Sequence, residues 1–299
     1  IIENNLFSEL SKNVNIIHID RNINDIKNNY ELRDDKVINI NEAYKKRDYF
    51  RLANFYFYNY GKNTLYFSRW FSNLNKKIHI PFNSYFLCLN VKNIKDNINK
   101  IIHDSENVNA IEVRVDLLES YDKKFIAKEI HYLKENINKP TIYTVRTISE
   151  GGKYPDDPRD LLLFGKKIGC EIIDVEMQYP INIPNVTIIG SVHGNDFKNK
   201  ISSSYNIVKP DIIKVVTDNK NNNSLSEFLN NYKIGKKIIL FTGEDGPISR
   251  VKNNFLTPVC SILNKTFSEQ LTYEEIAITK KILKYPILQK YGLFGSYIN

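Results

Sequence analysis

The sequence predicts an α/β fold, a (β/α)8 TIM barrel preceded by an incomplete α/β segment. Two observations predict the barrel. From Ser84 onward, short apolar strands rich in β-branched residues alternate with helical stretches, and eight such strands can be counted. Ionisable residues lie toward the carboxyl ends of these strands, where barrels of this type place their active sites. An open doubly wound sheet is the alternative, but no glycine-rich phosphate turn follows the first strand.

Residues 1–80 differ in character from the barrel region. A strand is expected at residues 13–19 and a helix at residues 24–30, followed by a polar, aromatic-rich segment through Tyr60. Residues 66–71 have apolar side chains at helical spacing. One strand and a few helices cannot close a core alone. We therefore expect this segment to be the end of a domain whose beginning is missing, and the start at Ile1 without Met suggests a fragment.

The barrel elements can be placed in chain order. The expected strands are Tyr85–Val91, Ala110–Leu118, Thr141–Thr147, Glu171–Met177, Val186–His193, Ile212–Thr217, Lys237–Thr242 and Phe255–Cys260. The clearest helical stretches between and after them are Asn93–His103, Lys123–Asn136, Pro158–Ile168, Ser224–Tyr232 and Tyr273–Leu283.

Composition narrows the classes of protein. A hydrophobic content of 42% supports a packed core, and the net charge of +8 could favour anionic partners. The charge is scattered without a dense Lys/Arg run, so we expect no nucleic-acid partner. No apolar run approaches the ~20 residues that span a bilayer, which predicts no membrane association. The widely spaced cysteines Cys88, Cys170 and Cys260 fit reduced thiols in a cytoplasmic protein.

Lys214 is the most informative single residue. It interrupts the otherwise apolar strand at residues 210–216. Burial disfavours an ammonium ion and so favours the neutral amine that a Schiff-base nucleophile needs. The alternative is a lysine whose stem is buried and whose head reaches water.

Other ionisable residues converge on the same end of the predicted barrel. They are Glu112, Arg114 and Asp116 in the second strand, Arg146 at the end of the third with Glu150 four residues on, Asp174 and Glu176 in the fourth, His193 at the end of the fifth, and Arg250 after the seventh. A strand carboxylate can also simply pair with an arginine on a neighbouring strand, and this reading stays open for Glu112, Asp174 and Glu176. Asp116 is expected to serve local structure.

These residues lie in motifs that resemble the type I 3-dehydroquinate dehydratase family. The motifs are Glu112-Val113-Arg114-Val115-Asp116, Thr144-Val145-Arg146-Thr147 with Glu150-Gly151-Gly152, Asp174-Val175-Glu176, Ser191-Val192-His193, Ile213-Lys214 and Ile248-Ser249-Arg250. The resemblance covers roughly residues 84–288. Residues 1–60 also resemble the end of a shikimate kinase, with residues 44–49 in place of its substrate-side segment, and residues 291–295 resemble the entry to a shikimate dehydrogenase. That order is similar to the pentafunctional arom polypeptides of fungi and some protists.

The resemblance implies a division of the chain and its partners. Residues 1–80 would be a kinase-like remnant and linker, residues 81–288 the dehydratase barrel, and residues 289–299 the start of the dehydrogenase-like domain. The expected partners are the small-molecule substrate 3-dehydroquinate, a second copy in a homodimer, and the other arom domains in the full-length chain. No Walker A motif is present, so we expect no ATP binding of the kinase type and an idle Arg47.

The resemblance also implies the chemistry. Lys214 would form an iminium with the substrate ketone, and His193 would act as general base and acid with a pKa near the operating pH. Glu150, with Asp174 as a second candidate, would orient the imidazole. Arg250 would bind the substrate carboxylate. The remaining substrate contacts would be Glu112, Arg114, Arg146, Asp174, Thr266 and Gln270, and neither a metal nor an organic cofactor is implied.

Two departures and two alternatives accompany this reading. The loop Thr266–Gln270 keeps the family glutamine but lacks its Pro and Gly, and His193 is followed by glycine where aspartate is usual. A class I aldolase or transaldolase would share the buried lysine, but would not require Arg250 or the pair of Arg146 and Glu150. A catalytically inactive, basic binding scaffold is the non-enzymatic alternative, and its binding would weaken steeply with salt.

Overall fold

The computed structural model describes residues 15–22, 53–61, 64–218, 222–232, 235–261, 265 and 269–284. Several predictions lie outside these residues. They are the helix at residues 24–30, the kinase-like segment at residues 44–49 with Arg47, the loop residue Thr266, and the dehydrogenase-like residues 291–295.

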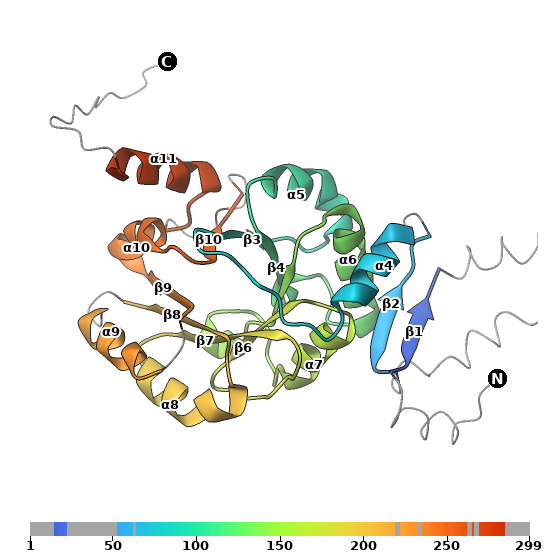
Figure 1. Cartoon of the computed structure of the whole chain (residues 1–299), viewed down its shortest axis with the longest axis horizontal. Helices are drawn as coiled ribbons and strands as arrows, with labels where there is room; N and C mark the ends of the chain where they lie inside the picture. The colour runs from blue at the N-terminus through green and yellow to red at the C-terminus, as the bar shows by residue number, and fades with distance from the viewer. Residues whose placement is uncertain are drawn as a thin grey trace, which may run out of the picture.

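An eight-stranded parallel sheet forms the centre of the molecule (Figure 1). Its strands are β3 (Tyr85–Leu89), β4 (Ala110–Arg114), β5 (Thr141–Thr144), β6 (Ile172–Glu176), β7 (Thr187–His193), β8 (Ile212–Thr217), β9 (Lys237–Phe241) and β10 (Thr257–Val259). They follow the order β10-β3-β4-β5-β6-β7-β8-β9. Each strand from β3 to β9 therefore pairs with the next, β10 returns to pair with β3, and the described residues show no pairing between β9 and β10. The sheet curls into a nearly closed barrel, which confirms the predicted (β/α)8 fold.

Helices connect the strands on the outside of the barrel. They are α5 (Ile98–Asp104), α6 (Lys123–Asn136), α7 (Arg159–Lys167), α8 (Phe197–Val208), α9 (Asn222–Asn230) and α10 (Gly246–Lys252), and α11 (Tyr273–Lys284) follows the last strand. Short 3-10 turns are η2 (Lys95–Asn97), η3 (Val115–Leu117), η4 (Ile148–Glu150) and η6 (Gly243–Asp245). Helix α6 begins where its capping residue Asp122 accepts a hydrogen bond from the backbone N–H of Phe125 at 2.9 Å.

Several strands are shorter than predicted. The clearest case is β4, which ends at Arg114 where the prediction ran to Leu118. Asp116 lies instead in the turn η3, where its carboxylate accepts hydrogen bonds from the Arg114 guanidinium and from the backbone N–H of Lys153. Asp116 therefore serves local structure, as the sequence indicated.

The inside of the barrel is layered. Its amino-terminal half is an apolar floor made of Ala110, Ile142, Ile172, Ile189, Ile212 and Ile238. Side chains alternate along a strand, so the residues two positions later also point inward. These are Glu112, Thr144, Asp174, Ser191, Lys214 and Leu240. Apart from Leu240, the residues of this second layer are polar. They lie toward the carboxyl-terminal end of the barrel, because the amino-terminal half is apolar, and a polar site can form there.

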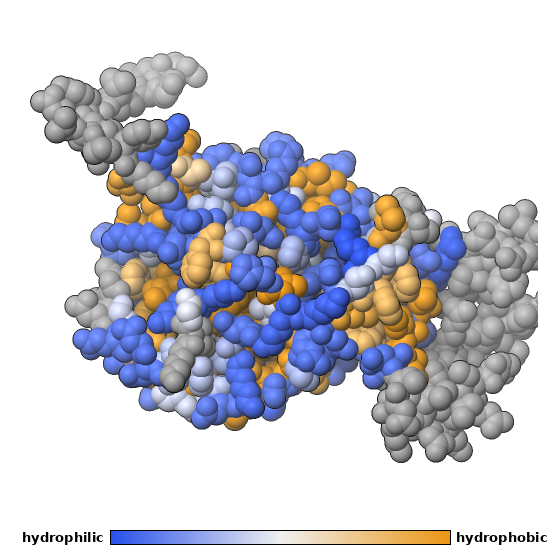
Figure 2. All heavy atoms as spheres, in the orientation of Figure 1, coloured by the Kyte–Doolittle hydropathy of each residue, from blue (hydrophilic) through white to orange (hydrophobic). Residues whose placement is uncertain are grey.

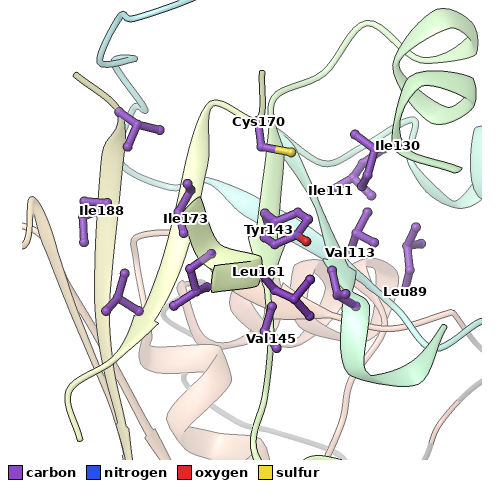
Figure 3. Packing of buried hydrophobic residues seen from close by; sticks show 14 of the residues in the cluster. Leu89, Ile111, Val113, Ile130, Tyr143, Val145, Leu161, Cys170, Ile173 and Ile188 are labelled. Carbon is purple, nitrogen blue, oxygen red and sulfur yellow. The ribbon is translucent and has the colours of Figure 1, made fainter. Parts of the chain in front are cut away.

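The outer faces of the strands pack against the helices and form the larger hydrophobic core. Figure 3 shows Leu89, Ile111, Val113, Tyr143 and other strand residues facing the helix residues Ile130 and Leu161. Cys170, which was expected to be a small buried apolar residue, lies in this cluster as a free thiol.

The described residues before the barrel form a small unit that packs on its flank (Figure 1). It consists of β1 (Ile17–Asp20), β2 (Phe55–Tyr58) and α4 (Thr64–Asn73), and the two strands pair in parallel. The expectation of one strand in this segment was wrong. All four residues of β2 are buried, so its sequence shows no alternation, and the aromatic run was interpreted as an irregular segment.

Trp70 in α4 joins this unit to the barrel. Its indole N–H donates to the carbonyl of Ile168 at 2.9 Å, and its ring lies against Phe57. On the viewed face, Figure 2 shows apolar residues gathered over this flank, and Ile19, Leu65 and Phe71 are exposed there. Among the described residues, none of the helices has the length and apolarity to cross a bilayer.

Candidate active site

A cavity of about 580 Å³ opens at the carboxyl-terminal end of the barrel. Most of the predicted site residues line it, namely Glu112, Arg114, Arg146, Glu150, His193, Lys214, Arg250 and Gln270. Asp174 lies buried beside them, and Thr266 lies outside the described residues. Lys214 and His193 therefore open onto the same end of the barrel.

Lys214 lies in β8 with only 6% of its surface exposed. Its Nζ donates a hydrogen bond to Asp174 Oδ2 at 3.1 Å and lies 3.6 Å from Glu112 Oε1. The ring of Phe86 covers it on another side, with its centroid 5.8 Å from Nζ. The head group of Lys214 is thus held inside the barrel between two carboxylates, and its amine can be reached through the cavity.

The two carboxylates beside Lys214 are both anionic at neutral pH. Burial alone would raise the pKa of Asp174, but the charges of Arg146 and Lys214 lower it below the ordinary range. The pKa of Glu112 is lowered in the same way, because Lys214 and Arg114 outweigh the effect of its burial. Glu112 also accepts a hydrogen bond from the Thr144 hydroxyl at 2.8 Å.

Arg146 is the main counter-charge of the inner layer. Its guanidinium donates to Asp174 at 3.0 Å, to Glu176 at 3.2 Å and to the Ser191 hydroxyl at 2.9 Å. Ser191 in turn donates a short hydrogen bond to Asp174. Asp174 and Glu176 therefore pair with a neighbouring arginine, which is the reading that the sequence left open for them. Asp174 also accepts a hydrogen bond from Lys214.

His193 ends β7 and is held by Glu150. One carboxylate oxygen, Oε2, lies 2.9 Å from the ring Nδ1 and accepts the backbone N–H of His193 at 2.7 Å. The turn that carries Glu150 depends on two glycines. Gly151 has a φ of +80°, and a Cβ on Gly152 would lie 2.1 Å from the carbonyl oxygen of Arg146. The motif Glu150-Gly151-Gly152 is thus needed to bring the carboxylate to the imidazole.

The imidazole is a neutral base in this setting. Burial, followed by the nearby charge of Arg146, lowers the pKa of His193 to about 4, and the hydrogen bond that the ring donates to Glu150 offsets only part of this effect. The expectation of a pKa near neutrality is therefore not met. The reason is that the sequence could not show that the side chain is enclosed except for 24% of its surface, or that a guanidinium lies close to it.

The remaining predicted residues lie at the rim of the cavity. Arg114 is engaged with Asp116 through two hydrogen bonds of 2.8 and 2.7 Å. Arg250 belongs to α10, where one of its nitrogens donates to the carbonyl of Gly246 at 2.9 Å. Gln270 lines the cavity together with Glu269, whose carboxylate accepts the backbone N–H of Gly243 at 3.0 Å.

One charged residue near the histidine was missed from the sequence. Lys200 in α8 donates a hydrogen bond to Glu150 Oε1 at 2.7 Å. The residues around Lys200 in the sequence do not distinguish it from a surface lysine, and α8 was not among the helices predicted from the sequence. A helix beginning directly after the His193 strand was the only available signal. Within the described part of the chain, no cluster of three or more His, Cys, Asp or Glu is arranged to hold a metal ion.

Curated proteins similar to this chain include polypeptides of two yeasts. A pentafunctional AROM polypeptide of Kluyveromyces lactis is 33% identical over 230 residues, which cover 67% of this chain and 14% of that protein. The Saccharomyces cerevisiae (strain S288c) protein of the same name is 30% identical over 230 residues with the same coverage. The chain thus spans about one seventh of the length of the relatives it matches.

Solved structures and a family model agree with these relatives. A structure titled dehydroquinate dehydratase and shikimate dehydrogenase from S. pombe AroM is 27% identical, has a TM-score of 0.57, and covers 66% of this chain and 45% of its own. The 3-dehydroquinate dehydratase of Aquifex aeolicus, 17% identical with a TM-score of 0.53, covers 67% of this chain and 99% of its own and shares the fold. The type I 3-dehydroquinase model matches residues 85–284, from the first barrel strand to α11. Because this match spans more than half of its length, the chain belongs to the type I 3-dehydroquinase family.

Proposed function

We propose that this chain converts 3-dehydroquinate to 3-dehydroshikimate and water through a Schiff base on Lys214, with His193 as general base and acid. The observation that carries the proposal is that Lys214 and His193 line the same cavity. The lysine amine is buried but can be reached through the cavity, and the neutral histidine is held by the Glu150 carboxylate. A nucleophilic amine and a neutral base facing one small-molecule cavity are the two groups that imine-based dehydration needs. The names of the family and of the similar proteins support the choice of substrate.

Imine formation is the first step. The Lys214 ammonium and the substrate ketone combine to an iminium and one water, with no net change in protons. The proton that Nζ must lose before attack can pass to His193 and return to the departing hydroxyl of the carbinolamine. The anionic side chains of Asp174 and Glu112 then stabilise the positive iminium where the ammonium had been.

Elimination is the second step. The iminium withdraws electrons and acidifies the neighbouring C2 proton, which His193 removes to leave an enamine. The imidazolium then protonates the hydroxyl at C1, which leaves as water and restores a conjugated iminium. A second water hydrolyses this iminium, releases 3-dehydroshikimate and returns the Lys214 ammonium. Glu150 holds the imidazole through Nδ1 during both transfers, which leaves Nε2 to carry the proton.

Substrate recognition would come from the rim. Arg250 presents a planar guanidinium suited to the substrate carboxylate, and Gln270 and Arg114 offer donors for the ring hydroxyls. Arg146 would act mainly by balancing Asp174 and Glu176, since its donors already bond to them. The cavity volume lies within the range of about 300–1,000 Å³ typical of small-molecule sites.

Borohydride trapping tests the proposal. Reduction of the chain in the presence of 3-dehydroquinate should leave a stable adduct on Lys214, located by peptide mass spectrometry. Lys214→Ala should abolish both the adduct and the absorbance of the conjugated enone product. Lys209→Ala is the matched control, because Lys209 is exposed and lies just before the same strand.

Different outcomes separate the alternatives. An adduct with sugar phosphates but none with 3-dehydroquinate would replace dehydration by aldolase or transaldolase chemistry. No adduct and no turnover, together with salt-sensitive binding to polyanions, would favour an inactive binding scaffold.

The larger setting is also a proposal. The division into residues 1–80, 81–288 and 289–299, with shikimate kinase-like and shikimate dehydrogenase-like flanks, follows the order of the arom polypeptides. A cytoplasmic location, a homodimer and cooperation with the other arom domains belong to the same proposal. Phosphorylation of shikimate by ATP with this chain would contradict the expectation of an inactive kinase-like remnant.

A further inference from the structure

Lys200 contacts Glu150 of the Glu150–His193 pair and has no part in the proposed mechanism. It lies in the first turns of α8, the helix that follows the His193 strand. Its Nζ is 2.7 Å from Glu150 Oε1, its side chain is 22% exposed, and the Glu150 side chain is fully buried. The partly exposed Lys200 ammonium therefore forms an ion pair with the buried Glu150 carboxylate inside the site.

The two oxygens of Glu150 have separate partners. Oε2 faces the ring and backbone of His193, whereas Oε1 faces Lys200. A carboxylate held at both oxygens cannot rotate about its terminal bond without breaking a charge-assisted hydrogen bond. The direction in which Glu150 receives the His193 Nδ1–H is thus fixed from α8.

The charge of Lys200 also reaches the imidazole through Glu150. Around His193 the charged groups are Glu150 of η4, Arg146 after β5, Asp174 of β6 and Lys214 of β8. Glu150 is the anion that favours the imidazolium most directly, through its hydrogen bond to Nδ1. Lys200 compensates part of that negative charge, as does Arg146 at 3.8 Å, and so weakens the stabilisation of the imidazolium.

We propose that Lys200 is a positioning residue, which fixes the orientation of Glu150 and keeps His193 neutral by compensating the carboxylate. Its consequence for turnover rests on the proposed dehydration, whereas its effect on the titration of His193 does not. Loss of the cation should leave the charge of the Glu150 carboxylate less compensated beside the ring, with one of its two oxygens no longer held.

The test is a titration of the histidine rings by NMR in the full chain. The chain has five histidines, and the signal of His193 is assigned by its loss in His193→Gln. Lys200→Gln and Lys200→Met should raise the His193 midpoint by about half to one pH unit, because the carboxylate is then compensated less. Lys200→Arg should restore the wild-type midpoint. Lys198→Gln removes the same charge from an exposed position of the same helix and should leave the midpoint unchanged.

Turnover of 3-dehydroquinate gives the second readout. In the neutral variants the acidic limb of the kcat profile should move to higher pH in parallel with the NMR midpoint. Maximal kcat should fall about tenfold, less than the full contribution of a general acid/base, since His193 and Glu150 remain.

The outcomes are distinct. Folded Lys200→Gln and Lys200→Met chains whose His193 midpoint matches the wild type would overturn the proposal. Neutral variants that fail to fold would also count against it, because the ion pair would then be required for structure. A wild-type chain without enone formation would refute the proposed function, while the NMR titration would still decide the role of Lys200.

Discussion

The charged side chains inside the barrel form contacts in which positive and negative charges balance one another. Lys214 and Arg146 lie among Glu112, Asp174 and Glu176, and each cation touches more than one anion. Removing one partner of a buried ion pair leaves an uncompensated charge, which costs roughly 3–5 kcal/mol. Substitutions in this layer will therefore change stability together with activity, and residues nearer the rim are better probes of chemistry.

The strand period predicted which residues face the cavity, because alternation along a strand is a local property. It could not predict their pairing. Contacts such as that of Arg146 with Ser191 depend on the stagger between strands that are far apart in the sequence. The same limit applies to the neutral state of His193, which depends on burial and on the charge of Arg146.

His193→Ala should lower kcat for 3-dehydroquinate by about 10²-fold or more, because the general base and acid is lost while Lys214 stays in place. Borohydride should still trap the imine on Lys214 in this variant. Full turnover in His193→Ala, measured by enone absorbance, would remove His193 from the mechanism.

At the scale of elements, the prediction succeeded where one face of a segment is exposed. Helix α6 was expected with the bounds that the structure shows, because its buried and exposed residues repeat at helical spacing. Strand β2 was missed because it is covered on both sides, by α4 and by barrel helices, and no period is left to read. The short helix α10 was not among the helices predicted from the sequence.

The contact of α6 with the flanking unit depends on the buried His131. Its Nδ1 lies 2.5 Å from the Tyr66 hydroxyl and its Nε2 lies 3.1 Å from the carbonyl of Tyr56, so both ring nitrogens have partners. His131 is therefore a buried structural histidine. Burial lowers its pKa from 6.5 to about 3.

This burial predicts a loss of stability in acid. The folded pKa lies below the unfolded one, so His131 has no effect well above pH 6.5 and destabilises the fold as pH falls from 6.5 toward 3. Between pH 7 and pH 4.5 it should remove about 2–3 kcal/mol from the free energy of unfolding.

Urea unfolding of the wild type and of His131→Asn at several pH values isolates this contribution. The wild type should lose about 2–3 kcal/mol more than the variant over that range. Two curves that stay parallel from pH 7 to pH 4.5 would show that His131 does not titrate as expected.

At the scale of the whole molecule, the flanking unit and the barrel share one packed interface. Trp70 lies so close to Gly169 that a Cβ there would stand 2.2 Å from the indole Nε1. The backbone of Gly169 also has a φ of +81°, a conformation that residues with a Cβ rarely adopt.

The family match begins at the barrel and confirms the predicted enzyme class, a hydro-lyase. The boundary at residue 80 remains a prediction, and this interface crosses it.

Gly169→Ala should therefore displace Trp70 and lower the free energy of unfolding by about 2–4 kcal/mol, from overpacking and backbone strain together. Trp70 is the sole tryptophan, so its fluorescence reports this contact, and circular dichroism reports the barrel. In the wild type both signals should change at the same urea concentration.

Gly235→Ala is the matched control, since nothing lies within 4 Å of its added Cβ. It should leave the urea midpoint nearly unchanged. A fluorescence transition well before the circular dichroism transition would show instead that the flanking unit unfolds on its own.

The isoleucine floor beneath Lys214 determines the route by which small molecules enter and leave the cavity. In the described part of the chain, apolar side chains and Ile80 fill the amino-terminal half of the barrel, and the cavity lies on the other side of them. A reactant and its product must then use the same opening in opposite directions. Each catalytic cycle would end with an exchange at that single mouth, so that an occupied barrel excludes the next molecule until it empties.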